Sequence, residues 1–167
     1  MAVVDRNSDV IANMVATPAV FNDPHTHGLV REALGICTPA ADDTQASVHR
    51  FVRIPTNARI TDVLIAAADA SSAGKYDFGF YYPADVNAGA VIDADALADA
   101  FDLSGGPFYW SEVRTVSIVT IAESEKPAWE LAGLSADPGG YFDIAGTIDT
   151  TFNGGPTTVG LKVRYVI

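Results

Sequence analysis

The C-terminal residues of the chain alternate between apolar and polar side chains with a period of two, which is the pattern of a half-buried β-strand. The alternation continues to the final residue, and its apolar members are Val159, Leu161, Val163, Tyr165 and Ile167. Residues 141–152 alternate in the same way, with Phe142, Ile144 and Ile148 on one face and Tyr141, Asp143, Thr147 and Asp149 on the other. The intervening Asn153-Gly154-Gly155-Pro156 predicts a hairpin connection between two antiparallel strands.

Short strand-like segments separated by turn residues also precede this region. Residues 48–54 are rich in β-branched and aromatic side chains and end at the turn Pro55-Thr56-Asn57. Residues 60–67 are apolar on both faces, which indicates a covered strand. Residues 76–82 place Tyr76, Phe78, Phe80 and Tyr82 on one face. We also expect strands over 29–36, where the pattern is ambiguous between strand and helix and we favour a strand, and over 115–121.

Two segments favour a helix. Asp93 is a suitable N-cap, and apolar residues recur at positions 94, 97, 98 and 101 before the stop at Gly105-Gly106-Pro107. Ser124 as cap and Pro127 in the first turn predict a second, shorter helix over 124–131. The pattern as a whole predicts an all-β fold, an antiparallel β-sandwich or jelly-roll-like domain with one or two short helices. We expect an extended N-terminal arm over 1–28 and a single β-sandwich domain over 29–167.

The charge balance argues against polyanionic partners. Ten Lys and Arg against 21 Asp and Glu give a formal charge of −11, and nothing resembles a basic stripe. Nucleic acid and anionic membrane surfaces are therefore not expected as partners. A single cysteine, Cys37, allows no intrachain disulfide and fits assembly in a reducing cytoplasm. Since no signal peptide or bilayer-length apolar run is present, we expect a soluble protein.

The sharpest candidate for chemistry is a possible metal motif. His25-Thr26-His27 is followed by Glu32, and this His-x-His-x4-Glu spacing resembles the first metal-binding motif of the cupins. The resemblance is partial, because Ala19 and Pro39 replace the cupin glycines and Asp23-Pro24 places the pair in a turn. We therefore predict no metal, cofactor or catalytic residues, and keep His25, His27 and Glu32 as weak metal candidates.

Two further features are candidates for partner contact. Residues 76–113 contain seven acidic residues and no Lys or Arg. These carboxylates either cap a helix and lie in solvent, or form an acidic face to which a basic partner docks. Phe108, Tyr109 and Trp110 follow a glycine pair, and such aromatics serve either as partner contacts or as a plug for the open end of a sandwich.

Three segments together resemble a known family. They are Arg53-Ile-Pro-Thr-Asn-Ala-Arg-Ile60, Tyr76-Asp-Phe-Gly-Phe-Tyr-Tyr82 and Gly89-Ala-Val-Ile-Asp-Ala-Asp-Ala-Leu-Ala98. The stretch over 48–101 is similar to small proteins encoded beside the major capsid protein in many tailed phages, which are regarded as head decoration or cement proteins. The arm and the C-terminal strands have no match in this resemblance, and it carries over no functional residue.

The resemblance implies a non-enzymatic virion protein on the capsid surface that binds the major capsid protein and stabilises the shell. We also expect self-association, with a trimer as the expected state. The residues we expect at partner contacts are Val10, Ile11, Met14, Val20, Phe21, Phe108, Tyr109 and Trp110. The alternatives are a carbohydrate-binding sandwich, with Tyr81, Tyr82, Tyr109 and Trp110 as stacking platforms, and a cupin-like metalloenzyme.

Overall fold

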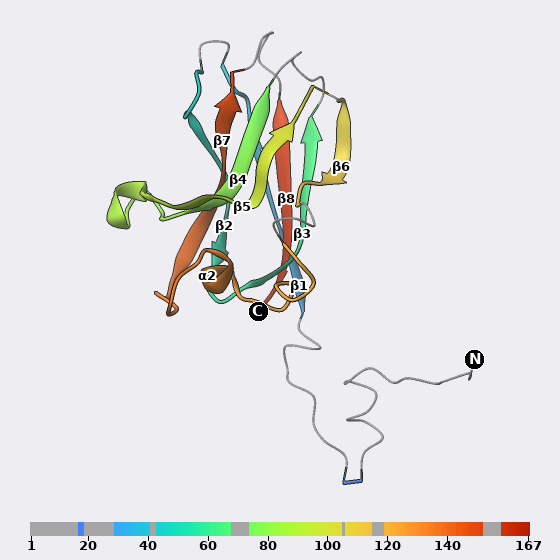
Figure 1. Cartoon of the computed structure of the whole chain (residues 1–167), viewed down its shortest axis with the longest axis vertical. Helices are drawn as coiled ribbons and strands as arrows, with labels where there is room; N and C mark the ends of the chain where they lie inside the picture. The colour runs from blue at the N-terminus through green and yellow to red at the C-terminus, as the bar shows by residue number, and fades with distance from the viewer. Residues whose placement is uncertain are drawn as a thin grey trace, which may run out of the picture.

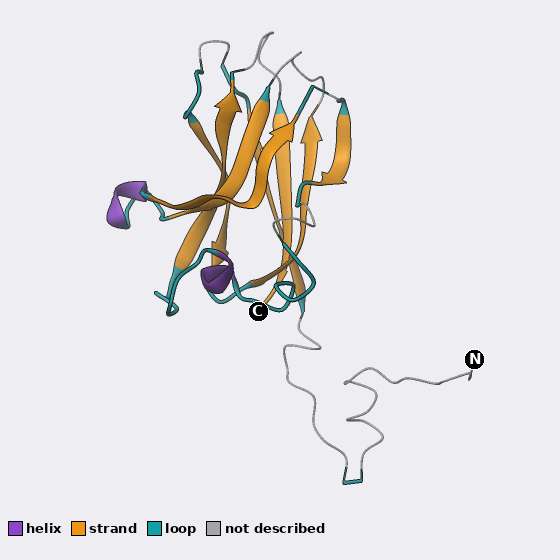
Figure 2. Cartoon of the chain, in the orientation of Figure 1, coloured by secondary structure: helices purple, strands orange, loops and turns teal. Residues whose placement is uncertain are grey.

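The computed structural model describes residues 17–18, 29–40, 43–67, 74–104, 106–114, 119–151 and 158–167. These residues form two antiparallel four-stranded sheets that face each other, with little helix (Figures 1 and 2). None of the described helices is long and apolar enough to span a membrane. The predicted all-β sandwich is confirmed.

The strands of the two sheets interleave along the chain. The first sheet has the order β1-β8-β3-β6, with β1 at Val30–Cys37, β8 at Val159–Val166, β3 at Arg59–Ala67 and β6 at Phe108–Glu112. The second sheet has the order β2-β7-β4-β5, with β2 at Val48–Pro55, β7 at Tyr141–Thr150, β4 at Lys75–Tyr81 and β5 at Val91–Asp102. This order is that of an eight-stranded jelly roll.

The hydrophobic core lies between the sheets and is rich in aromatic side chains. Tyr76, Phe78 and Phe80 of β4 are fully buried, as the alternation of residues 76–82 predicts. Tyr76 and Phe78 contact each other with ring centroids 5.4 Å apart, and Phe80 and Phe142 do so at 5.8 Å. Edge and tilted contacts of this kind stabilise a core beyond the area that they bury.

The predicted helix over 93–101 is wrong, because this segment is strand β5. Its pairing with β4 is irregular: Phe78 lies opposite Ala98, whereas Phe80 lies opposite Asp93. Five residues of β5 therefore span the distance that two residues of β4 cover. A strand that bulges in this way loses its period of two, and its apolar residues fall at the spacing of a helix.

Other predicted elements are shorter or differently connected. The helix α2 covers only Ala128–Leu131, with Pro127 as its N-cap, and the Ser124 hydroxyl instead donates to the Ile121 carbonyl at 2.7 Å. Of the strand expected over 115–121, residues 119–121 form a bend and a turn, and 115–118 lie outside the described residues.

The predicted hairpin at 153–156 is also wrong. Strand β7 pairs with β2 and β4, whereas β8 pairs with β1 and β3 in the other sheet. The connection therefore crosses between the sheets. The N-terminal arm, apart from residues 17–18, lies outside the described residues.

Candidate interaction surface on the first sheet

The side chain of Trp110 lies across the outer face of the first sheet. The β3–β6 pairing shifts register between Ile65 and Ala67, and the backbone of Trp110 has a φ of 51°, a value that non-glycine residues rarely adopt. A Cβ built on Gly160 would lie 3.6 Å from Cη2 of Trp110, and the Lys162 ammonium lies 4.2 Å from the indole centroid. The indole therefore reaches across β3 to β8 and covers Gly160.

A groove of about 490 Å³ opens beside this indole. Its walls include Leu34 and Ile36 of β1, Ala66 of β3, and Tyr109 and Trp110 of β6. Ile36 is 65% exposed and Tyr109 is 86% exposed. Among the described residues that line the groove none is charged. Large apolar side chains gathered on an exposed sheet face are typical of a contact surface for a partner.

Charged residues follow the groove along the same face. Glu32 of β1 accepts a hydrogen bond from Nε of Arg164 at 3.0 Å, and Lys162 lies 3.5 Å from its other oxygen. The hydrogen bond from Arg164, helped by Lys162, holds the pKa of Glu32 below its ordinary value. Since Glu32 is engaged by two cations, it makes a poor metal ligand.

The other two metal candidates, His25 and His27, lie outside the described residues. Within the described part of the chain, no group of three His, Cys, Asp or Glu side chains has the arrangement of a metal site.

The predicted contact residues fall into two groups. The structure brings Phe108, Tyr109 and Trp110 together at the groove, where Phe108 also packs on Phe101 with centroids 5.4 Å apart. The five candidates in the arm lie outside the described residues; they are Val10, Ile11, Met14, Val20 and Phe21. Sequence reasoning missed Leu34 and Ile36, although their spacing of two in an expected strand places them on one face.

The four aromatics of the carbohydrate-binding alternative do not share a surface. Tyr81 is buried in the second sheet, where its hydroxyl is hydrogen-bonded to Thr147 and the Arg50 guanidinium lies 5.2 Å from its ring centroid. Tyr82 packs on Phe142 with centroids 6.1 Å apart. Neither ring therefore joins Tyr109 and Trp110 in one stacking platform.

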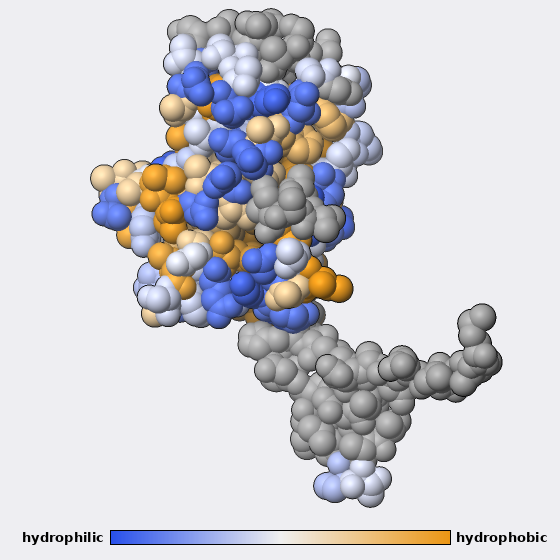
Figure 3. All heavy atoms as spheres, viewed as in Figure 1, coloured by the Kyte–Doolittle hydropathy of each residue, from blue (hydrophilic) through white to orange (hydrophobic). Residues whose placement is uncertain are grey.

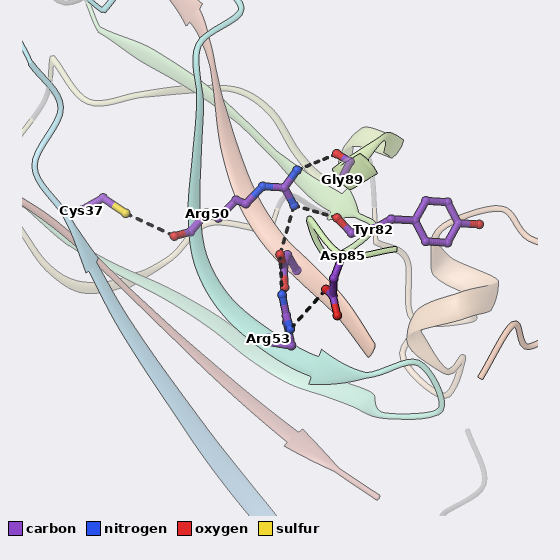
Figure 4. A network of polar contacts seen from close by, with 7 residues as sticks. Cys37, Arg50, Arg53, Tyr82, Asp85 and Gly89 are labelled. Carbon is purple, nitrogen blue, oxygen red and sulfur yellow. Dashed lines mark hydrogen bonds and ion pairs between the residues drawn. The ribbon is translucent and has the colours of Figure 1, made fainter. Parts of the chain in front are cut away.

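A second feature is the connection between β4 and β5 together with the first residue of β5, residues 82–91, which we call the finger. It contains the short helix η2 (Asn87–Gly89) and projects from the side of the sandwich opposite β6 (Figure 1). Arg50 of β2 fixes its base, because Nη1 donates to the Tyr82 carbonyl at 2.8 Å and Nη2 donates to the Gly89 carbonyl at 2.6 Å (Figure 4).

Arg50 is itself held by a buried carboxylate. Asp143 of β7, only 5% exposed, accepts from Nη1 of Arg50 at 3.1 Å and from Nε of Arg53 at 2.6 Å. The hydrogen bond to Asp143 raises the pKa of Arg53, so the Arg53 guanidinium stays charged. Sequence reasoning placed Asp143 on a polar face; in the structure it is buried and paired.

A third polar group lies where β1 and β2 approach each other. His49 hydrogen-bonds the Tyr76 hydroxyl through Nδ1 at 2.6 Å and the Asp43 carboxylate through Nε2 at 2.9 Å. The Cys37 thiol donates to the Arg50 carbonyl at 3.4 Å, and burial raises its pKa. A thiol held in this protonated form is a weak nucleophile, so we interpret this group as structural.

The comparisons with known proteins locate the fold. No protein-family profile matches the chain, and no curated protein matches its sequence. A chain of the cyanophage Pam1 capsid asymmetric unit aligns with a TM-score of 0.55 at 12% identity, over 84% of this chain and 86% of that chain. A chain of the acid-stable capsid of Helicobacter pylori bacteriophage KHP30 aligns with a TM-score of 0.41 at 12% identity, over 84% and 90%. The similarity to the Pam1 chain shows a shared fold.

Proposed function

We propose that the protein is a non-enzymatic component of a phage virion, a decoration or cement protein that binds the major capsid protein on the capsid surface. The observation that carries this proposal is the fold shared with a chain of the Pam1 capsid along most of both chains. The resemblance of residues 48–101 to decoration proteins points the same way and comes from sequence alone.

The arm over 1–28 is the proposed link to the shell. The sequence predicts an extended segment before the edge strand β1, and an extended backbone can add to the sheet edge of a neighbouring protein. Its apolar residues, Val10, Ile11, Met14, Val20 and Phe21, would fill pockets on that neighbour. Because binding is linked to the assembled shell, it stabilises the shell by mass action.

Co-sedimentation of the purified protein with shells of its source virus tests this function. We expect saturable binding of the full chain and loss of binding when residues 1–28 are deleted. A variant with the five apolar arm residues changed to serine should bind at least tenfold more weakly, by analogy with anchor residues in other interfaces. The matched control changes the polar arm residues Asn7, Ser8 and Asn13 to alanine and should bind normally.

The outcomes separate two claims. Absence of saturable binding by the full chain would refute the cement function. Undiminished binding of the deleted chain, with its β-sheet circular dichroism intact, would refute only the role of the arm.

A further inference from the structure

We propose that the end of the Arg53 guanidinium, at the base of the finger, binds an acidic side chain of a shell subunit. We take the shell as the partner from the proposed function, whereas the binding site itself can be measured on the purified chain without shells.

A β-bulge in β2 brings two arginines to the same face of the second sheet. The pairing of β2 with β7 shifts register between Arg50 and Val52, so Phe51 is an extra residue in β2. Side chains three residues apart in a regular strand point to opposite faces, and one extra residue between them brings them to the same face. Arg50 and Arg53 therefore both reach the carboxylate of Asp143.

This carboxylate occupies only one side of the Arg53 guanidinium. Asp143 accepts hydrogen bonds from Nε of Arg53 at 2.6 Å and from Nη2 at 3.3 Å. The end of the guanidinium, formed by Nη1 and the second hydrogen of Nη2, points away from Asp143. Two parallel N–H groups of this kind match the two oxygens of a carboxylate, which is the geometry of the strong bidentate pairs that arginine forms.

Asp85 of the finger faces this end of Arg53 at a longer distance. Its Oδ1 lies 4.0 Å from Nη1 of Arg53, which is too long for a hydrogen bond (Figure 4). The Asp85 side chain is 79% exposed and the Arg53 side chain is 48% exposed. An ion pair as open as this contributes little to stability. A carboxylate that hydrogen-bonds both nitrogens can therefore displace Asp85.

The dimensions of the pocket indicate the class of ligand. The pocket has a volume of about 220 Å³, and its lining residues are Arg50, Phe51, Val52, Arg53 and Asp143. Small-molecule pockets usually measure about 300–1,000 Å³, so this one suits a single acidic side chain rather than a whole metabolite. Beside it the finger exposes 47% of Val86, and apolar atoms are visible on the projection in Figure 3. A carboxylate receptor next to an apolar contact suits an acidic residue that a protein chain presents.

The formal charge of −11 does not prevent this contact. At physiological salt, exposed charges more than about 8 Å apart are largely screened, so the nearest charges decide the binding of one carboxylate. In the described part of the chain these are two guanidinium groups, the buried Asp143 and the exposed Asp85. Removing the charge of Asp85 should therefore strengthen binding.

NMR titration of the isotope-labelled full chain tests the site. The probe is a capped tripeptide with glutamate between two alanines, added into the millimolar range, and its matched control carries glutamine instead. We expect the glutamate peptide to shift the Nε–H signal of Arg53 saturably and the glutamine peptide to leave it unchanged. Absence of a saturable shift in both the wild type and Asp85→Asn, or equal shifts with the two peptides, would overturn the proposal.

Two substitutions test the roles of the charged groups. Asp85→Asn should bind the glutamate peptide about fivefold more tightly, because a like charge about 4 Å away in water changes an equilibrium by about this factor. Asp99→Asn removes the same charge from an exposed position of β5 outside the pocket, and it should bind as the wild type does. Arg53→Lys keeps the charge but has no fork, and it should bind at least fivefold more weakly. Circular dichroism checks the fold of Arg53→Lys; Asp85 is exposed, so its variant decides the question if Arg53→Lys does not fold.

Co-sedimentation with shells identifies the partner. If the acidic residue belongs to a shell subunit, Asp85→Asn should bind shells more tightly than the wild type and Arg53→Lys more weakly. Unchanged shell binding by both variants would overturn the assignment of the partner to the shell. Absence of shell binding by the wild type would refute the proposed function, and the peptide titration would still decide whether the site binds a carboxylate.

Discussion

Replacing Gly79 with alanine tests whether the bend of β5 over β4 positions the finger. Gly79 lies where β5 crosses β4, between the pairs Phe78–Ala98 and Phe80–Asp93. A Cβ at this position would lie 2.0 Å from the carbonyl oxygen of Asp93 and 2.5 Å from the carbonyl carbon of Ala94. Both atoms belong to the backbone, so no side-chain rotation relieves the clash.

The size of the effect follows from these distances. An ordinary C···O contact is about 3.3 Å, so β5 would have to retreat by about 1.3 Å. Overpacking of this kind costs about 1–3 kcal/mol, and each ladder hydrogen bond that is lost adds about 1 kcal/mol. Alanine recovers about 0.5–1 kcal/mol of backbone entropy. We therefore expect a net loss of about 2–3 kcal/mol in the free energy of unfolding, which lowers Tm by about 5–10 °C in a domain of this size.

Urea unfolding followed by circular dichroism measures this loss, and the chain offers a matched control. Gly160 of β8 is also a strand glycine, but its Cβ would meet its nearest atom at 3.6 Å, an ordinary contact. Gly160→Ala should therefore stay within about 0.5 kcal/mol of the wild type. Equal urea midpoints for the two variants would refute the assignment of Gly79 as the residue that permits the bend.

Three other predictions concern ionisable and polar groups. Burial raises the pKa of Tyr76 above its ordinary value of 10.0, so the native state keeps a proton that the unfolded state loses. The free energy of unfolding should therefore fall as pH rises above 10, and for Tyr76→Phe, measured at pH 9–12, it should fall less steeply with pH. The hydrogen bond from the Ala40 N–H lowers the pKa of Asp43 below 3.8, so the ionised Asp43 stabilises the folded state above that pH and this contribution is lost as pH falls. The free energy of unfolding of Asp43→Asn should therefore fall less steeply in acid than that of the wild type. Asp143→Asn should lower the free energy of unfolding by about 2 kcal/mol and speed amide hydrogen exchange in the finger, whereas unchanged exchange would contradict the role of Arg50 as its clamp.

Most of the strands were predictable because a strand with one covered face records its environment in the sequence. The segments 29–36, 48–54, 60–67 and 76–82 each lie within one residue of an observed strand. Except for 29–36, whose pattern is ambiguous between strand and helix, the signal is local: β-branched or aromatic residues bounded by turn residues. The core aromatics of β4 follow from the same alternation.

The predictions that were wrong concern features that depend on residues distant in the sequence. Residues 93–101 have the spacing of a helix because β5 bulges over Gly79, and nothing within the segment records that contact. The turn residues at 153–156 predict a hairpin, but local sequence does not say whether the next strand returns to the same sheet. In this jelly roll the strand that follows enters the other sheet.

The candidate site was predictable only where its residues adjoin in sequence. Phe108, Tyr109 and Trp110 attract notice as a cluster, whereas Leu34 and Ile36 become part of the same groove only through the pairing of β1 with β8 and of β8 with β3. That register also places Gly160 between Ile36 and Ala66, and two small residues side by side give the Trp110 indole room to lie across the sheet. Substituting a large residue at Gly160 should therefore displace the indole and close the groove, although neither residue is near the other in sequence. The groove thus depends on the strand register rather than on any one segment. Substitutions of Gly160 should therefore weaken the binding of a partner in the groove as much as substitutions of the aromatic residues do.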